Sequence, residues 1–95
     1  MIKIIAQFFI KSKHIDEAIL LGKNLSIETR KEDGCIGYEF YQNDEDKNHL
    51  VFTEKWESEY HLMQHLVTPH FTNFVIKIDK LKSKERIIES FNTII

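Results

Sequence analysis

The chain has 95 residues, 42% hydrophobic and 12% aromatic, and its 13 basic and 15 acidic side chains give a net charge of −2. This composition excludes intrinsic disorder, and the length is that of a single domain over residues 1–95. The interspersed charges exclude a basic surface for nucleic acid and a basic amphipathic helix for a membrane. The lone Cys35 excludes an internal disulfide and is typical of a reducing compartment.

The segment from Ile2 to Ile10 predicts a strand with apolar residues on both faces. Lys3 and Gln7 interrupt the apolar run, which is far too short to span a bilayer and lacks a small-residue cleavage site. We therefore interpret it as the first strand of a cytoplasmic protein. Because the strand is apolar on both faces, we expect both faces of its sheet to be covered.

A helix is predicted from Ile15 to about Lys31, with acidic residues in its first turn and basic residues in its last. Gly22 lies on the apolar stripe of this helix, where glycine costs up to about 1 kcal/mol relative to alanine. We expect it to permit a close approach of the sheet or of a ligand. The helix ends at Asp33-Gly34, where Gly34 suits a left-handed cap.

Two strands, over residues 35–42 and 49–57, flank a polar turn and predict a hairpin. Ser58 has the position of an N-cap for the helix that follows, and Thr68-Pro69 breaks that helix. A second helical pattern begins directly after the break. The segment from Phe52 to Phe74 thus concentrates three histidines, Trp56 and Glu54 in one strand–helix–helix unit.

A basic connector over residues 80–84 leads to a last strand predicted over residues 85–95. The order β-α-β-β-α-α-β is that of the ferredoxin-like split β-α-β fold, an α+β architecture with a four-stranded antiparallel sheet and helices on one face. The other face needs a partner, and two sheets packed face to face in a homodimer would provide one. The last strand could also reach across to the partner.

Three segments, in order, resemble motifs of the antibiotic biosynthesis monooxygenase (ABM) domain family. Residues 33–38, DGCIGY, resemble its E/D-G-C-x-G-Y turn; residues 54–58, EKWES, its E-x-W-E/D-S segment; and residues 65–71, HLVTPHF, its H-L-x-T/S-P-H-F segment. The likeness covers essentially the whole chain and is strongest to the branch of small quinol monooxygenases. These motifs specify the domain more than the reaction, because the family also contains haem-degrading enzymes and an isomerase of a phosphorylated sugar.

The resemblance implies a dimeric α/β barrel with a pocket between each sheet and its helices. It also implies oxidation of a small aromatic hydroquinone or polyphenol by molecular oxygen, with no cofactor. Haem degradation is disfavoured, because Val75 stands where the haem branch has its axial histidine. Phe8 and His65 stand where that branch has an asparagine and a tryptophan.

Three side chains are the catalytic candidates. His65 is either a general base near neutral pH or a buried histidine that hydrogen-bonds Glu54 and fixes its helix on the strand. Glu54 either orients His65 or anchors a substrate hydroxyl, unless it is a structural carboxylate that holds a helix terminus. Tyr38 either donates a hydrogen bond to a phenolate oxygen or only buries its ring.

Further residues are expected to contact the substrate: Phe8, Trp56, His61, His70, Phe71 and Phe74. His61 and His65 have the H-x-x-x-H spacing that zinc can use, with Glu54 or His70 to complete a site. Leu62 stands where the usual zinc motif has glutamate, so we expect no metal.

The sequence leaves two alternative functions open. An isomerase of a small sugar phosphate would need a cationic clamp, yet Arg30 and Arg86 lie near the ends of predicted elements rather than at the expected pocket. A non-enzymatic dimer that binds a small molecule would need only the pocket.

Overall fold

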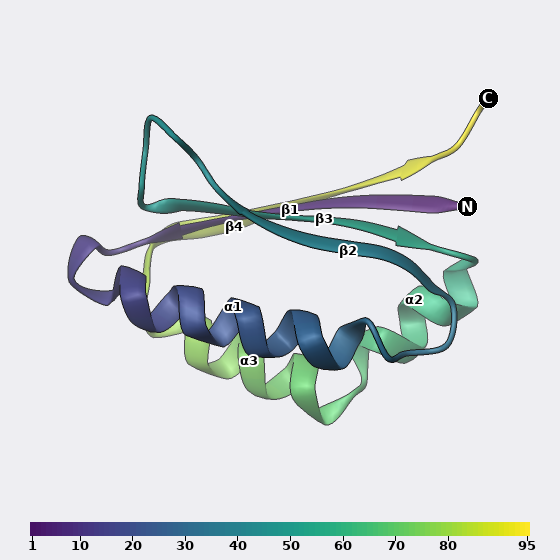
Figure 1. Cartoon of the computed structure of the whole chain (residues 1–95), viewed down its shortest axis with the longest axis horizontal. Coiled ribbons are helices and arrows are strands. Elements are labelled where there is room, and N and C mark those ends of the chain that lie inside the picture. The colour runs from purple at the N-terminus through teal and green to yellow at the C-terminus, as the bar shows by residue number, and fades with distance from the viewer.

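The computed structural model describes all 95 residues and has two layers, a four-stranded sheet and a layer of helices on one face (Figure 1). All neighbouring strands are antiparallel, in the order β2-β3-β1-β4. The predicted ferredoxin-like α+β fold is confirmed. The elements are β1 (Ile2–Ile10), a 3-10 helix (Ser12–His14), α1 (Ile15–Thr29), β2 (Cys35–Gln42), β3 (His49–Trp56), α2 (Glu59–Leu66), α3 (Pro69–Asp79) and β4 (Lys82–Asn92).

The strand register forms rows of side chains across the face of the sheet that the helices cover. One row crosses all four strands as Tyr38, Glu54, Ile4 and Ser90. The next row crosses them as Phe40, Phe52, Ala6 and Ile88. The first row contains three polar side chains and the second none, so polar groups line one end of the central part of this face and apolar groups the other.

Three phenylalanines at the centre of the core join the sheet to α3. The ring centroid of Phe8 lies 5.7 Å from that of Phe52 and 5.6 Å from that of Phe74, and Phe52 and Phe74 are also 5.6 Å apart. All three pairs are edge-to-face, a geometry that adds about 0.5–1.5 kcal/mol per pair to the burial of the rings. These contacts hold α3 over β1 and β3.

Gly22 allows α1 to approach the sheet closely, as the sequence predicts. A Cβ atom at this position would overlap the ring of Phe40 on β2. Gly34 has a φ of +81°, which confirms the expected left-handed conformation. It lies beyond the end of the helix, however, because α1 ends at Thr29 rather than at Lys31.

The end of α1 and the limits of β4 differ from the prediction for physical reasons. After α1 the chain tightens into i→i−3 turns, in which the amide of Glu32 donates to the carbonyl of Thr29. The strand β4 begins at Lys82 and ends at Asn92, instead of spanning residues 85–95. Its ends pair with the ends of β1, Lys82 with Ile10 and Asn92 with Ile2, so β4 extends as far as β1 offers partners.

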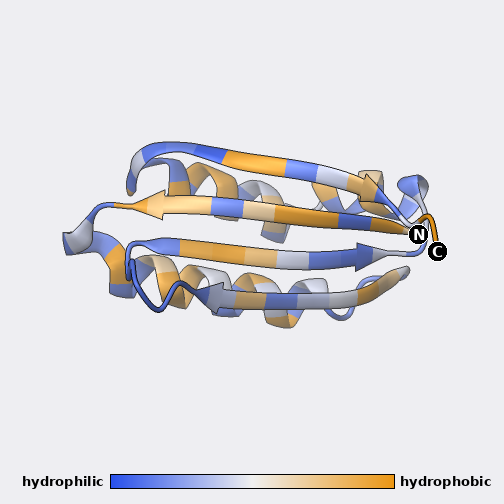
Figure 2. Cartoon of the chain, turned by 90° about the horizontal axis from the view of Figure 1, so that it is seen from above, coloured by the Kyte–Doolittle hydropathy of each residue, from blue (hydrophilic) through white to orange (hydrophobic).

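The outer face of the sheet is not covered by any helix (Figure 2). It carries Ile87 and Phe91 of β4, which are 46% and 45% exposed, and Tyr41 of β2, which is 53% exposed. No helix of the structure is both long enough and apolar enough to cross a membrane.

Candidate active site

A cavity of about 220 Å³ lies between the helix-facing side of the sheet and the helices α2 and α3. Eleven of its 14 lining residues are hydrophobic, and Glu54 and His65 are the only acidic or basic side chains among them. A cavity of about 150 Å³ with an aliphatic and aromatic lining is large enough to bind benzene. This cavity can therefore hold one aromatic ring with small substituents.

The cavity has a closed polar end and an open mouth. At the closed end, Tyr38 and His65 are each 1% exposed and Glu54 is 6% exposed. At the other end, Leu66 is 37% exposed and Ile88 on the edge strand β4 is 51% exposed. A ligand would therefore enter beside β4 and meet the titratable groups last.

His65 and His70 converge on one carboxylate oxygen outside the cavity. Nδ1 of His65 lies 2.7 Å from Oε2 of Glu32, and Nε2 of His70 lies 2.8 Å from the same atom. His65 is in the last turn of α2 and His70 in the first turn of α3. Thr68 connects the two helices, since its side chain accepts from the amide of Phe71 at the start of α3 and donates to the carbonyl of His65 in α2.

Glu32 determines which nitrogen of His65 is free. An ionised carboxylate only accepts hydrogen bonds, so neutral His65 must carry its proton on Nδ1 and a lone pair on Nε2. Nε2 is buried and has no hydrogen-bond partner in the chain. Burial lowers the pKa of His65, although Glu32 partly opposes this effect. The ring thus remains a neutral acceptor at neutral pH, with an unused lone pair.

Glu54 and Tyr38 lie side by side on neighbouring strands of the sheet. Burial raises the pKa of Glu54 to about 7, while the indole N–H of Trp56, which donates to Oε1 at 3.0 Å, partly opposes the shift. Burial and the nearby Glu54 carboxylate raise the pKa of Tyr38, so its hydroxyl keeps its proton. The closed end therefore holds an acceptor at His65, a donor at Tyr38 and a carboxyl group that can serve as either.

The structure corrects the predicted partner of His65. His65 does not hydrogen-bond Glu54. The carboxylate that its Nδ1 contacts is that of Glu32. Glu54 neither orients His65 nor holds a helix terminus, since its partner is Trp56 on the same strand.

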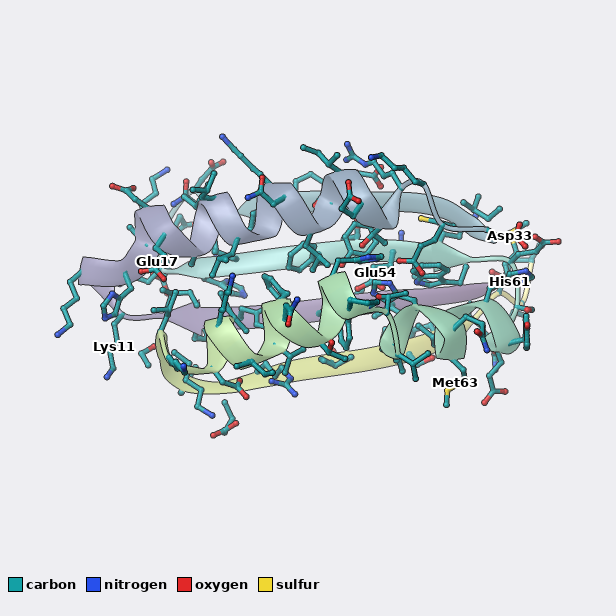
Figure 3. All side chains as sticks on the ribbon, turned by 90° about the horizontal axis from the view of Figure 1, so that it is seen from below. Lys11, Glu17, Asp33, Glu54, His61 and Met63 are labelled. Carbon is teal, nitrogen blue, oxygen red and sulfur yellow. The ribbon has the colours of Figure 1, made fainter.

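Of the residues expected to contact substrate, Phe8, Phe71 and Phe74 line the cavity, whereas Trp56, His61 and His70 do not. Trp56 is fully buried behind His65, with ring centroids 4.8 Å apart. His61 lies beside Asp33 at the end of the molecule, away from Glu54 (Figure 3). Its Nδ1 is 2.7 Å from the hydroxyl of Ser58, and that contact draws the ring away from the cavity.

The carboxylate and ring-nitrogen atoms of Glu32, His65 and His70 lie within 4.8 Å of one another, which is close enough to hold a cation. The H-x-x-x-H pair of His61 and His65, the spacing that zinc can use, does not converge on one point, because His61 faces Ser58 and Asp33. Two N–H···O hydrogen bonds already account for the geometry of the Glu32 cluster.

Glu32 is the functional residue that no sequence pattern indicates. It lies in a charged run, Lys31-Glu32-Asp33, whose residues read as solvent-exposed, and it is 33 positions from His65. Only the i→i−3 turns after α1 direct its side chain inward. No spacing rule links it to either histidine, although its place just before the DGCIGY motif marks the segment.

A split β-α-β sheet whose helices enclose an apolar cavity with a buried histidine defines the class of this protein as a small ferredoxin-like α+β domain with an internal ligand-sized cavity. The chain belongs to the antibiotic biosynthesis monooxygenase family, whose sequence model matches residues 1–77. A crystal structure of an antibiotic biosynthesis monooxygenase superposes with a TM-score of 0.95 at 33% identity, covering 99% of both chains. The resemblance inferred from the three motifs is confirmed.

Two sequence relatives are similar to this chain over part of their length. "Uncharacterized protein sll1783" from Synechocystis sp. is 33% identical over 82 residues, which is 86% of this chain and 56% of that protein. "Putative monooxygenase Rv0793" from Mycobacterium tuberculosis is 34% identical over 56 residues, which is 59% of this chain and 54% of that protein. The matched part of this chain thus spans about half the length of each relative.

Proposed function

We propose that this protein is a cofactor-independent monooxygenase that oxidises a small aromatic hydroquinone or polyphenol with molecular oxygen. The observation that carries the proposal is the buried Nε2 of His65, which has no partner in the chain and belongs to a ring that lines an apolar cavity. An unpaired buried polar atom costs about 1–3 kcal/mol, so a ligand that donates a hydrogen bond would offset a cost already present in the free protein. Family membership and the name of the mycobacterial relative support an oxygenase reaction.

In the proposed reaction, the substrate hydroxyl gives its proton to Nε2 of His65. The ring becomes an imidazolium, which the carboxylate of Glu32 stabilises through Nδ1–H. The phenolate is more electron-rich than the phenol and passes one electron to oxygen, giving a substrate radical and superoxide. These recombine to form the new carbon–oxygen bond of a peroxide, which takes the proton back from His65. Loss of water then breaks the O–O bond and leaves a hydroxyquinone, so the substrate supplies all four electrons that reduce oxygen and the protein supplies none.

The remaining groups of the cavity would position the substrate and exclude water. Tyr38 keeps its proton and can donate to the phenolate oxygen, while Glu54 can anchor the same hydroxyl before the proton moves. Phe8, Phe71 and Phe74 form apolar walls that strengthen these contacts by keeping water out.

The cavity gives no support to a sugar phosphate as substrate. No lysine or arginine lines it. Arg30 donates to the backbone carbonyl of Tyr38, and Arg86 forms an ion pair with Asp79 at 2.8 Å, so neither cation is available as a phosphate clamp.

Oxygen uptake by metal-stripped protein, measured with a panel of hydroquinones, tests the proposal. We expect turnover by the wild type and a loss of at least about 100-fold in His65→Gln, because general base catalysis contributes roughly 10²–10⁴-fold. The matched control is His61→Gln, on the same helix but outside the cavity, which should retain turnover. No uptake above background by the wild type, or equal rates in His65→Gln, would refute the proposal; binding without turnover would favour a non-enzymatic binding protein.

A further inference from the structure

Ser90 places a free hydroxyl at the mouth of the cavity, at the far end of the polar row from Tyr38 and Glu54. It lines the cavity from the edge strand β4, directly across from Ile4. The side chain of Ser90 is exposed and forms no hydrogen bond within the chain. Two polar positions thus flank one apolar residue on the floor of the cavity.

The register sets the distance between these polar positions. Glu54 is paired with Ile4, and Ile4 with Ser90, so the backbones of Glu54 and Ser90 are two strand spacings apart, about 9–10 Å, and both side chains rise from the same face of the sheet. One aromatic ring over Ile4, with a hydroxyl at each end and a hydrogen bond of about 2.7–2.8 Å beyond each hydroxyl, spans such a gap. Neighbouring hydroxyls on a ring would reach only one of the two positions.

The rest of the cavity restricts the ligand to an uncharged molecule. It has no cationic side chain to compensate a carboxylate or phosphate, and its walls are hydrophobic. Burying an unpaired anion there would be strongly unfavourable. A neutral diol can instead place its inner hydroxyl among Tyr38, Glu54 and His65 and its outer hydroxyl beside Ser90.

We propose that Ser90 is a second hydroxyl-binding residue, which makes the cavity selective for uncharged aromatic diols with hydroxyls at opposite ends of one ring. The proposal deepens the proposed function, because it takes the inner hydroxyl to be the one that His65 deprotonates. Ser90 touches the outer hydroxyl only and sets specificity rather than chemistry.

Anaerobic binding measured by NMR titration separates this role from a structural one. The probes are 1,4-dihydroxybenzene, 1,2-dihydroxybenzene and phenol, each titrated into wild type, Ser90→Ala and Ser90→Thr. We expect Ser90→Ala to weaken binding of the 1,4-diol about three- to tenfold, the value of one neutral hydrogen bond, and to leave phenol unchanged. Ser90→Thr, which keeps the hydroxyl, should restore binding of the 1,4-diol.

The matched control is Ser83→Ala, on the same strand but outside the cavity, which should bind all three probes as the wild type does. An equal loss for phenol and the 1,4-diol, or no loss for either, would overturn the role of Ser90. Because oxygen is absent, failure of the oxidation assay leaves this result unaffected. If the wild type takes up oxygen but Ser90→Ala binds the 1,4-diol as tightly as the wild type does, the role of Ser90 is refuted while the proposed oxidation stands.

Discussion

One oxygen atom of Glu32 receives hydrogen bonds from two imidazole rings, and this arrangement gives His65 its chemical character. The bond at 2.7 Å fixes the tautomer, and the negative charge of Glu32 stabilises the imidazolium that forms when His65 accepts a proton. His70 holds the same oxygen from the other side at 2.8 Å. We regard Glu32 as a positioning residue, since it acts on the substrate only through His65.

Glu32→Gln should lower kcat/KM by at least about tenfold, because the amide cannot stabilise the imidazolium by charge. The carboxylate of Glu32 raises the pKa of His65, so its removal should also move the acid limb of the pH–rate profile to lower pH. Oxygen uptake between pH 5 and 8 measures both effects. Glu28→Gln, one turn earlier and paired with Lys31 on the surface, is the control; an unshifted acid limb in Glu32→Gln would exclude the electrostatic role.

Glu54 should make the stability of the protein fall as pH rises. Its ordinary pKa of 4.5 applies in the unfolded chain, whereas burial raises the pKa to about 7 in the folded one. Between these values the unfolded chain has released a proton that the folded chain keeps, so stability is lost through this window, by about 3 kcal/mol at most. Glu54→Gln should remove this pH-dependent loss of stability. Its free energies of unfolding in urea at pH 5 and pH 8 should therefore differ less than those of the wild type. Glu39→Gln, exposed on β2, should not change it.

The sequence could predict His65 and Glu54 because their types and periodicity place them on the inner faces of α2 and β3. It could not predict how they pair. Glu54 accepts a hydrogen bond from the indole of Trp56, two residues along its own strand. His65 is bonded to Glu32, which lies in a turn 33 residues earlier in the sequence. Both outcomes depend on how α2 packs over the sheet, which no local pattern encodes.

At the scale of elements, the contact between α1 and β2 depends on the absence of a side chain at Gly22. The ring of Phe40 occupies that space and stacks on Phe52 with centroids 4.3 Å apart, so it has little room to withdraw. Gly22→Ala gains up to about 1 kcal/mol of helix propensity but overpacks this contact, at a cost of about 1–3 kcal/mol. We expect a net loss of about 1 kcal/mol in urea unfolding.

The matched test of that contact is a second substitution. Phe40→Leu in the Gly22→Ala background should recover part of the lost stability, because it removes the overlapping ring atoms. Asn24→Ala, at an exposed position of α1, should not destabilise the protein. A Gly22→Ala variant more stable than the wild type would show that the helix can shift without loss.

A helix or strand was predictable where its own residues encode it. Its ends were not predictable where a neighbouring element sets them. The alternating burial of β3 follows directly from its sequence, and Ser58 and Thr68 cap α2 and α3 as residues of their type should. The limits of β4 are set by the length of β1, its only neighbour in the sheet. The ends of an edge strand are therefore harder to predict from its own sequence than those of a central strand.

At the scale of the whole molecule, the sheet has one covered and one uncovered face. The outer face carries Ile87 and Phe91 at almost half exposure, and its central strand β1 adds Ile5 and Phe9, which are partly buried. No helix of this chain lies over it (Figure 2). We propose that a second copy of the chain covers this face, since two such faces are alike and can pair about a twofold axis.

Phe91→Glu should convert the proposed homodimer to a folded monomer, because pairing two such faces would bury the new carboxylates without partners. Light scattering after size exclusion at tens of micromolar protein gives the mass, and circular dichroism shows whether the fold is kept. Ile76→Glu is the control, since Ile76 is 58% exposed on α3, on the opposite side of the molecule from this face. A monomeric wild type, or a dimer unaffected by Phe91→Glu but lost in Ile76→Glu, would contradict the sheet-to-sheet arrangement. The 14 residues that line the cavity come from a single copy of the chain, so the monomeric variant should still bind 1,4-dihydroxybenzene.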